Sequence, residues 1–258
     1  MNYDSKKILN AVNELIPLKS EDTILITGSI IEGFGNLKSD LDVFVFKDDF
    51  KKIRDNRKNN DDFWFDKNTI SYNVLLDNER YDYCFYEYNF IESLIIKMQE
   101  WNYKDDPYVY SLDLEELNIL HRIKISKNIF GTKTFEKIEW EKLNYVLSMK
   151  KIVSVLNVHE DIEGAYLSRD FETLRILLYE YLIYIGESFL AIEGETNTGR
   201  KWFYKKQTRL EENSHIHLVN NYIEELYKVN IEDLLPKVLN LGNELLSIAD
   251  ENIGGIKL

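Results

Sequence analysis

Hydrophobic residues in the first third of the chain follow helical spacing and then strand spacing. From Ile8 to Ile16 they recur at helical intervals, and Pro17 ends this predicted helix. Short β-rich runs bounded by turn residues predict strands at residues 23–27, 41–46, 69–76 and 80–86. The charged segment 47–60 indicates a helix or a loop. These elements predict a mixed sheet of about four strands with flanking helices.

From about Phe90 onward the strand patterns nearly vanish and helical spacing dominates. The predicted fold is therefore α+β, with a mixed-sheet domain at residues 1–90 and a helical bundle at residues 91–258. The polar and basic interval 194–209 is the longest one in the second half without a predicted element. Helices are expected at residues 92–101, 113–129, 135–156, 171–192, 215–229 and 231–249.

The amino-acid composition argues against several classes of protein and of metal site. The 258 residues include 32 basic and 45 acidic ones, and this net charge of −13 disfavours nucleic acid as a partner. The single cysteine, Cys84, excludes an intrachain disulfide and a cysteine-rich zinc site. The apolar stretch 174–192 contains charged residues, which indicates a buried bundle helix and not a membrane span. The first residues lack the apolar core of a signal peptide, so a cytoplasmic location is expected.

Two aspartates at the start of the second predicted strand are the first candidate for chemistry. Strand side chains alternate, so Asp40 and Asp42 point to one face while Leu41 and Val43 point to the other. Two carboxylates on one face repel each other unless a cation lies between them, and oxygen ligands suit Mg²⁺. A solvated turn is the alternative explanation for such a pair.

Gly28 and Ser29 precede this pair and favour the metal interpretation. A glycine lets the backbone approach a phosphate closely, and a serine hydroxyl can donate a hydrogen bond to a phosphate oxygen. A phosphate cradle just before a metal-binding pair forms a coherent site for a nucleoside triphosphate. Gly33 and Gly35 are explained equally well by tight turns.

The stretch from Gly28 to Val43 resembles the signature of the DNA-polymerase-β-like nucleotidyltransferase superfamily. In this signature Gly-Ser is followed, after a gap of roughly ten residues, by two aspartates that alternate with hydrophobic residues. Gly33 and Ser39 also match the common form. Glu32 departs from it, because many small members carry a basic residue there.

The resemblance implies a third carboxylate on a neighbouring strand. Asp82 is the candidate, because it lies in the last predicted strand, shortly before a helix near Ile91. Glu87 is the rival, at the end of the same strand, and a surface charge at the strand edge is the plain alternative. Cys84 shares the face of Asp82 and is interpreted as a small buried residue.

The resemblance also implies the reaction. Asp40, Asp42 and Asp82 would bind Mg²⁺, and Asp82 would take the proton of an acceptor hydroxyl. Gly28 and Ser29 would hold the phosphates of a nucleoside triphosphate such as ATP. The hydroxyl would attack the α-phosphorus, and pyrophosphate would leave.

The helical half is expected to contribute cations to the nucleotide. Lys150 and Lys201 are the candidates for binding its phosphates, although a solvated lysine is the favoured interpretation of Lys150. Trp202, in the interval 194–209, is expected to anchor that segment to the bundle.

The leading hypothesis is a Mg²⁺-dependent nucleotidyltransferase acting on a small hydroxylated acceptor, with aminoglycoside-like antibiotics as one candidate. The acidic surface supports this hypothesis because such acceptors are cationic. One alternative is a toxin-type or signalling nucleotidyltransferase that modifies a protein, tRNA or another nucleotide. A second is a non-catalytic nucleotide-binding module. A homodimer is compatible with each of these.

Overall fold

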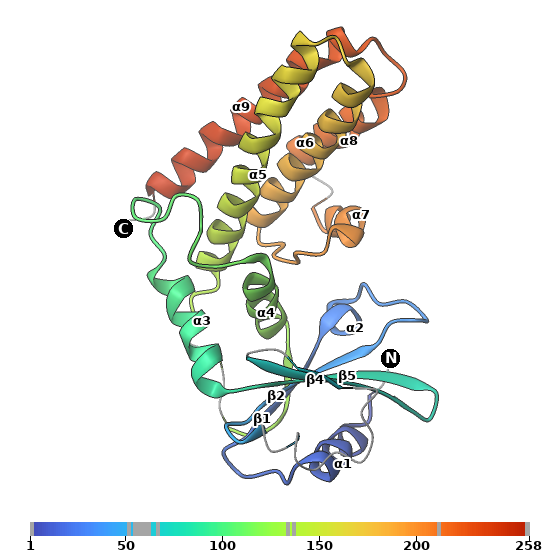
Figure 1. Ribbon diagram of the computed structural model, residues 1–258, viewed down its shortest axis with the longest axis vertical. Coiled ribbons are helices and arrows are strands. Elements are labelled where there is room, and N and C mark those ends of the chain that lie inside the picture. The colour runs from blue at the N-terminus through green and yellow to red at the C-terminus, as the bar shows by residue number, and fades with distance from the viewer. Residues whose placement is uncertain are drawn as a thin grey trace. The chain divides into compact units, whose positions relative to one another are not determined.

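The chain forms two compact units in a computed structural model (Figure 1). The structure describes residues 3–50, 53, 63–65, 68–132, 135, 138–210 and 213–255, with side chains only as far as residue 251. The first unit comprises Met1–Lys97 and Asn118–Ile138, and the second comprises Met98–Leu117 and Glu139–Leu258. The division into domains at residue 90 stays a prediction. Most of the segment 47–60, expected to be a helix or loop, lies outside the described residues.

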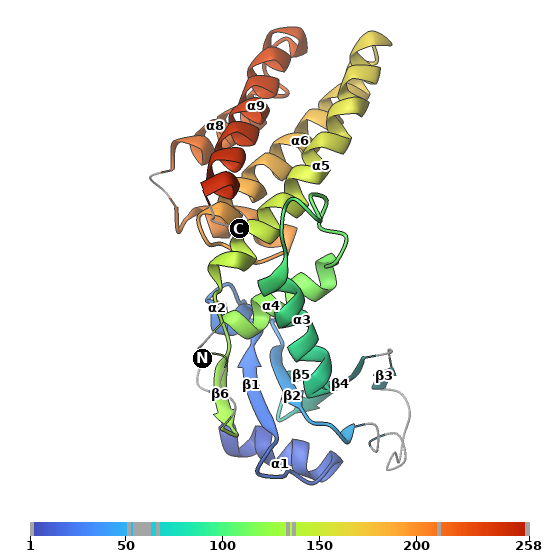
Figure 2. The same ribbon diagram turned by 90° about the vertical axis from the view of Figure 1, so that its left-hand side faces the viewer.

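Among the described residues, a six-stranded mixed sheet forms the centre of the first unit. Its order is β3-β4-β5-β2-β1-β6, and Figure 2 shows β6 beside β1 at one edge. All neighbouring strands are antiparallel except β2 and β5, which are parallel. The strands are Thr23–Thr27 (β1), Leu41–Phe46 (β2), Phe63–Phe65 (β3), Thr69–Leu76 (β4), Glu79–Tyr86 (β5) and Lys127–Phe130 (β6).

The four predicted strands are confirmed as β1, β2, β4 and β5, but two further strands were not expected. β3 and β6 are only three and four residues long, too short to display an alternating pattern. The expectation of a helix over 113–129 was wrong in its second part, where the chain forms β6. Helix α4 (Leu114–Lys124) ends first, and the chain then pairs with the edge of β1.

Helix α1 (Ser5–Leu15) packs on one face of the sheet, as Figure 1 shows. The Asp4 carboxylate caps its N-terminus by accepting hydrogen bonds from two backbone N–H groups. Ile8 and Val12 belong to the same buried cluster as Val43 and Val45 of β2. Because side chains alternate along a strand, Asp42 and its even-numbered neighbours lie on the opposite face.

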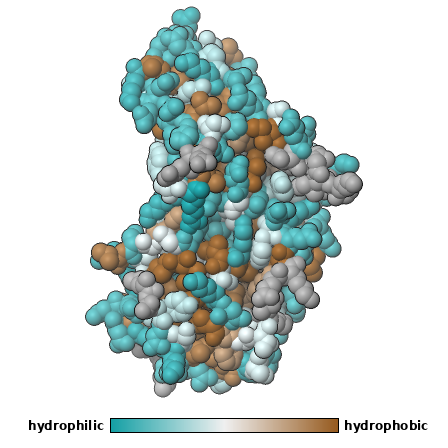
Figure 3. Space-filling model, turned by 180° about the vertical axis from the view of Figure 1, so that it is seen from behind, coloured by the Kyte–Doolittle hydropathy of each residue, from teal (hydrophilic) through white to brown (hydrophobic). Residues whose placement is uncertain are grey.

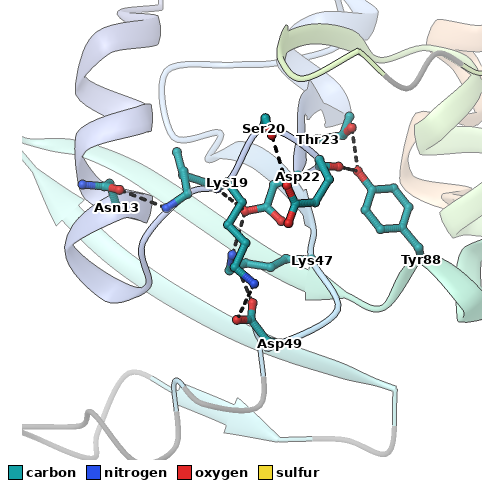
Figure 4. A network of polar contacts seen from close by, with 10 residues as sticks. Asn13, Lys19, Ser20, Asp22, Thr23, Lys47, Asp49 and Tyr88 are labelled. Atoms are coloured by element: carbon teal, nitrogen blue, oxygen red, sulfur yellow. Dashed lines mark hydrogen bonds and ion pairs between the residues drawn. The ribbon is translucent and has the colours of Figure 1, made fainter.

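A buried ion pair between Lys47 and Asp22 lies at the end of the sheet where β1 begins and β2 ends (Figure 4). The side chain of Lys47 is fully buried, and its Nζ lies 2.7 Å from Asp22 Oδ2 and 3.0 Å from Asp49 Oδ1. The backbone N–H of Lys19 also donates to Asp22. The Tyr88 hydroxyl, at the start of α3 (Tyr88–Glu100), lies 2.7 Å from Thr23 Oγ1. These contacts hold the segment before β1 against the segment after β2. Separating them would leave the Lys47 charge buried without its partner, which costs free energy.

We expect Asp22→Asn to lower the free energy of unfolding by about 3 kcal/mol, because the buried Lys47 ammonium loses its nearest counter-charge. Asp77→Asn is the matched control, since that carboxylate pairs with Lys7 but its side chain is 88% exposed. The control should change stability by less than about 1 kcal/mol. Urea denaturation of the two variants measures the difference, and equal losses would contradict a structural role for this pair.

Helices make up the second unit. The predicted helix 171–192 is confirmed residue for residue as α6, while α5 begins later and runs further than expected. None of the helices in the described part of the chain is both long and apolar enough to span a membrane. The helices are α5 (Glu141–Leu167), α6 (Phe171–Ile192), α7 (Phe203–Gln207), α8 (Ser214–Glu225) and α9 (Ile231–Gly255).

The interval 194–209 is more ordered than its polar sequence suggested. It contains a 3₁₀ turn (Arg200–Trp202) and the short helix α7. Lys206 of α7 is buried, and its Nζ lies 3.6 Å from Glu187 Oε1 on α6. The other oxygen of Glu187 lies 2.6 Å from Lys151 Nζ on α5. This buried cluster holds the interval against the bundle.

Candidate active site

Gly28 forms the corner between β1 and the short helix α2 (Gly28–Glu32). Its φ is +81°, in the left-handed region that L-residues with a side chain rarely adopt. A Cβ at this position would lie 1.7 Å from Asp42 Oδ2. Two constraints therefore require glycine here, and they bring the Gly-Ser corner directly against the Asp42 carboxylate.

Asp42 and Asp82 lie side by side on adjacent parallel strands. They are Cα partners in the register of β2 with β5, so their side chains share one face of the sheet. Glu87, the rival third carboxylate, follows the last residue of β5, at the opposite end of this strand pair. The register therefore brings Asp82 beside Asp42 and keeps Glu87 away from it.

Asp40 lies just before β2, on the same side as Asp42 by alternation. Its Oδ1 atom is buried and has no hydrogen-bond partner among the described residues. Arg80 Nη1 lies 3.7 Å from this oxygen, but the Arg80 side chain is 66% exposed. Such an exposed pair is screened by water and neutralises Asp40 only in part.

Arg122 is the site residue that sequence reasoning missed. Its Nη1 donates a hydrogen bond to Asp42 Oδ1 at 3.0 Å. Its guanidinium also lies 5.8 Å from the centre of the Phe44 ring. Arg122 is 80 positions from Asp42 in the sequence, in the last turn of α4, and no motif or spacing marks it. Only the tertiary structure brings the two residues together.

The pKa of Asp82 is raised because the residue is buried and other carboxylates lie close to it. Burial, followed by the negative charges of Asp42 and Asp40, raises the pKa of Asp82 to about 6, although Arg122 acts in the opposite direction. The ionised form of Asp82 is therefore disfavoured in the folded protein. A cation in this place would relieve that cost.

The donor chemistry of the three aspartates fits a hard divalent cation. They offer only oxygen atoms, Asp40 Oδ1 has no hydrogen-bond partner among the described residues, and Gly28 leaves its side-chain space open next to Asp42. Within the residues that the structure describes, no three His, Cys, Asp or Glu side chains converge in the arrangement of a metal site. Arg122 instead holds one oxygen of Asp42. A metal ion would thus require these side chains to reorient.

Glu32, which departs from the family signature, has a buried basic neighbour. His121 Nε2 lies 3.5 Å from Glu32 Oε1, and both side chains are nearly fully buried. Because His121 precedes Arg122 on α4, consecutive residues of this helix contact α2 and Asp42. The acidic residue at position 32 therefore belongs to the packing of α4 on the site.

Cys84 is buried on the face of Asp82, as predicted. Its Sγ lies 4.0 Å from Asp82 Oδ1 and 3.6 Å from Ser71 Oγ. Burial, followed by the charge of Asp82, raises the pKa of the Cys84 thiol to about 12. The thiol is therefore protonated at neutral pH and is a poor nucleophile.

Lys150 and Lys201 belong to the second unit, whereas the aspartates and the Gly-Ser corner belong to the first. Lys150 Nζ donates a hydrogen bond to the carbonyl of Val109 at 2.8 Å. Lys201 Nζ lies 5.0 Å from the centre of the Trp202 ring. Both lysines thus have contacts within their own unit, and their roles in nucleotide binding stay predictions.

A cavity of about 400 Å³ lies in the first unit, beside the start of β2. Leu41 and Tyr81 line it, and these residues alternate with the aspartates. Leu37 and Leu75, which also line it, are exposed. Apolar side chains reach the surface of both units on the face drawn in Figure 3, so exposure of leucines alone does not mark a binding site. Arg80, which approaches Asp40, also lines this cavity, so the cavity adjoins the Asp40 end of the site.

Comparisons with known proteins support the fold. No protein-family model and no curated protein sequence matches the chain. The structure is similar to the crystal structure of a nucleotidyltransferase-like protein from Exiguobacterium sibiricum 255-15, with a TM-score of 0.51 and 10% identity. The match covers 96% of this chain and 77% of that one. At this identity the likeness shows the fold alone, and it confirms the predicted one: a nucleotidyltransferase-like sheet followed by a helical region.

The raised pKa of Asp82 makes a prediction about stability and pH. The folded pKa lies above the unfolded value, so the folded chain binds this proton more tightly, and the resulting stability is lost as the pH rises through about 6. In chelator near pH 8, Asp82→Asn should therefore be more stable than the unmodified protein by about 1 kcal/mol, after allowance for solvent screening.

Near pH 5 this gain should shrink, because Asp82 is then largely protonated. Urea denaturation at the two pH values measures it, with Asp77→Asn as the exposed control. A gain that does not depend on pH would contradict the crowding of charges.

Proposed function

We propose that this protein is a divalent-metal-dependent nucleotidyltransferase that moves a nucleoside monophosphate from a nucleoside triphosphate to a hydroxyl group of a small acceptor. The observation that carries the proposal is the in-register pairing of Asp42 with Asp82, directly beside the Gly28 corner. The nucleotidyltransferase-like fold supports the same conclusion.

Each residue has a distinct role in this proposal. Asp40 and Asp42 would hold the divalent cation with the triphosphate, and Asp82 would serve the acceptor hydroxyl. A bound cation supplies neutralising charge for the phosphates and lowers the pKa of the acceptor hydroxyl. Ser29 and the backbone of Gly28 position the outer phosphates.

Asp82 is the proposed base. In the metal-free protein, burial and the neighbouring carboxylates raise the pKa of Asp82 to about 6, and Asp82 lies beside Asp42, on the face where the proposal puts the acceptor. It takes the proton of the acceptor hydroxyl while the hydroxyl oxygen forms a bond to the α-phosphorus. The bond from the α-phosphorus to the bridging oxygen breaks, and pyrophosphate leaves.

A cationic acceptor fits the net charge of −13, because an acidic protein attracts and concentrates positively charged molecules. An aminoglycoside-like compound combines positive charge with several hydroxyl groups, and it is therefore the first acceptor to test. The protein should be incubated with Mg²⁺, each labelled triphosphate and pooled acceptors. A mass gain of one nucleotide on a small acceptor supports the proposal, whereas a gain only on protein or tRNA, or no gain at all, contradicts it.

The assignment of the base makes a second prediction. Asp82→Asn should retain nucleotide binding, measured by calorimetry with Mg²⁺, but reduce transfer by about a hundredfold or more because the proton acceptor is gone. Glu87→Gln is the matched control, since Glu87 follows the opposite end of β5, and it should retain most of the transfer activity. The reverse outcome would move the base to Glu87.

A further inference from the structure

We propose that Arg122 is a built-in counter-ion of the aspartate cluster, which holds Asp42 when no metal is bound and must release it before a divalent cation can bind. This inference rests on the proposed function, because it concerns the same three aspartates. It adds a residue outside the Gly-Ser and aspartate signature and gives it a positioning role.

The backbone around Arg122 is fixed on the site from two directions. The hydroxyl of Thr27, the last residue of β1, donates a hydrogen bond to the Arg122 carbonyl. A few residues later β6 pairs with β1, and Lys127 is the Cα partner of Ile26. The end of α4 is therefore tied to the same strand that leads into Gly28. The reach of Arg122 to Asp42 thus follows from the sheet register and is not the chance orientation of a surface side chain.

The side chain of Arg122 binds one of the two Asp42 oxygen atoms that could serve as metal ligands. Its Nη1 lies 3.0 Å from Asp42 Oδ1, and the Asp42 side chain is only 13% exposed. A metal ion and a guanidinium group cannot both bind this oxygen from the same direction. Because the carboxylate is largely shielded from water, the pair is stronger than an exposed one.

In the absence of metal, the ion pair between Arg122 and Asp42 offsets the negative charge of the aspartates. Asp42 and Asp82 are partners on adjacent strands and Asp40 precedes them, and among the described contacts Arg80 pairs with Asp40 and Arg122 with Asp42. Arg80 is 66% exposed and approaches Asp40 only to 3.7 Å, whereas Arg122 is 28% exposed and donates a hydrogen bond. Of these two arginines Arg122 makes the closer and more shielded contact, and it weakens the affinity for metal by competition.

Metal binding without nucleotide tests the inference. The metal-free full-length protein is titrated with Mn²⁺, and the free ion is measured by electron paramagnetic resonance. Arg122→Gln should bind Mn²⁺ about tenfold more tightly than the unmodified protein, which corresponds to about 1.4 kcal/mol. Arg122→Lys should lie between the two, because a lysine keeps the charge but lacks the planar guanidinium group.

Arg80→Gln is the matched control, since it also removes one positive charge beside the cluster but not the bond to Asp42. It should strengthen Mn²⁺ binding less than about twofold. If Arg80→Gln strengthened Mn²⁺ binding as much as Arg122→Gln does, the loss of any nearby positive charge would explain both effects, and the inference would be overturned. Thermal melting gives a second readout. In chelator Arg122→Gln should melt at a lower temperature than the unmodified protein. Mn²⁺ should raise the melting temperature of Arg122→Gln by more than that of the unmodified protein.

The outcomes separate the inference from the proposed function. Unchanged Mn²⁺ affinity in Arg122→Gln, with clear binding by the unmodified protein, overturns the role of Arg122 and leaves the nucleotidyltransferase proposal standing. If Arg122→Gln does not fold, Arg122→Lys decides, and affinity no tighter than that of the unmodified protein overturns the inference. No Mn²⁺ binding by any of the proteins contradicts both the inference and the metal-dependent function.

Discussion

The parallel pairing of β2 with β5 is the constraint on which the candidate site depends. This pairing makes Asp42 and Asp82 partners, and a slip of one residue would turn one of the two carboxylates to the face that α1 covers. The apolar residues that follow Asp42 in β2 oppose such a slip, because Val43 and Val45 are buried under α1. The packing of one face of the sheet therefore fixes the chemistry of the other.

Buried charge is compensated in two different ways in this molecule. Lys47 has Asp22 and Asp49 within 3.0 Å, and Glu187 has two lysines around it, so each of these clusters contains its own counter-charges. The aspartate cluster is different, because its strongest neutralising contact comes from Arg122 and the pKa of Asp82 remains raised. A structural cluster gains from complete compensation, whereas a site that must bind a cation gains from an incomplete one.

The position of the acidic Glu32 also acquires a physical explanation. A basic residue at this point of the signature would face the nearly buried His121 of α4, whereas a glutamate can pair with it. The sequence departs from the signature at the residue of α2 that contacts His121 of α4. The departure leaves the Gly28 corner and the aspartates unchanged.

The strands that carry the site were predictable from the sequence alone. Alternation over residues 41–46 defined both faces of β2, and the Gly-Ser and aspartate spacing indicated the fold. The tertiary structure alone decided which groups neutralise the site, because Arg122 reaches Asp42 across 80 positions through the pairing of β6 with β1. The pairing of α7 with the bundle through Glu187 was hidden for the same reason. Local patterns record which face a side chain takes, whereas the partner of a buried charge is set by contacts between segments that are distant in the chain.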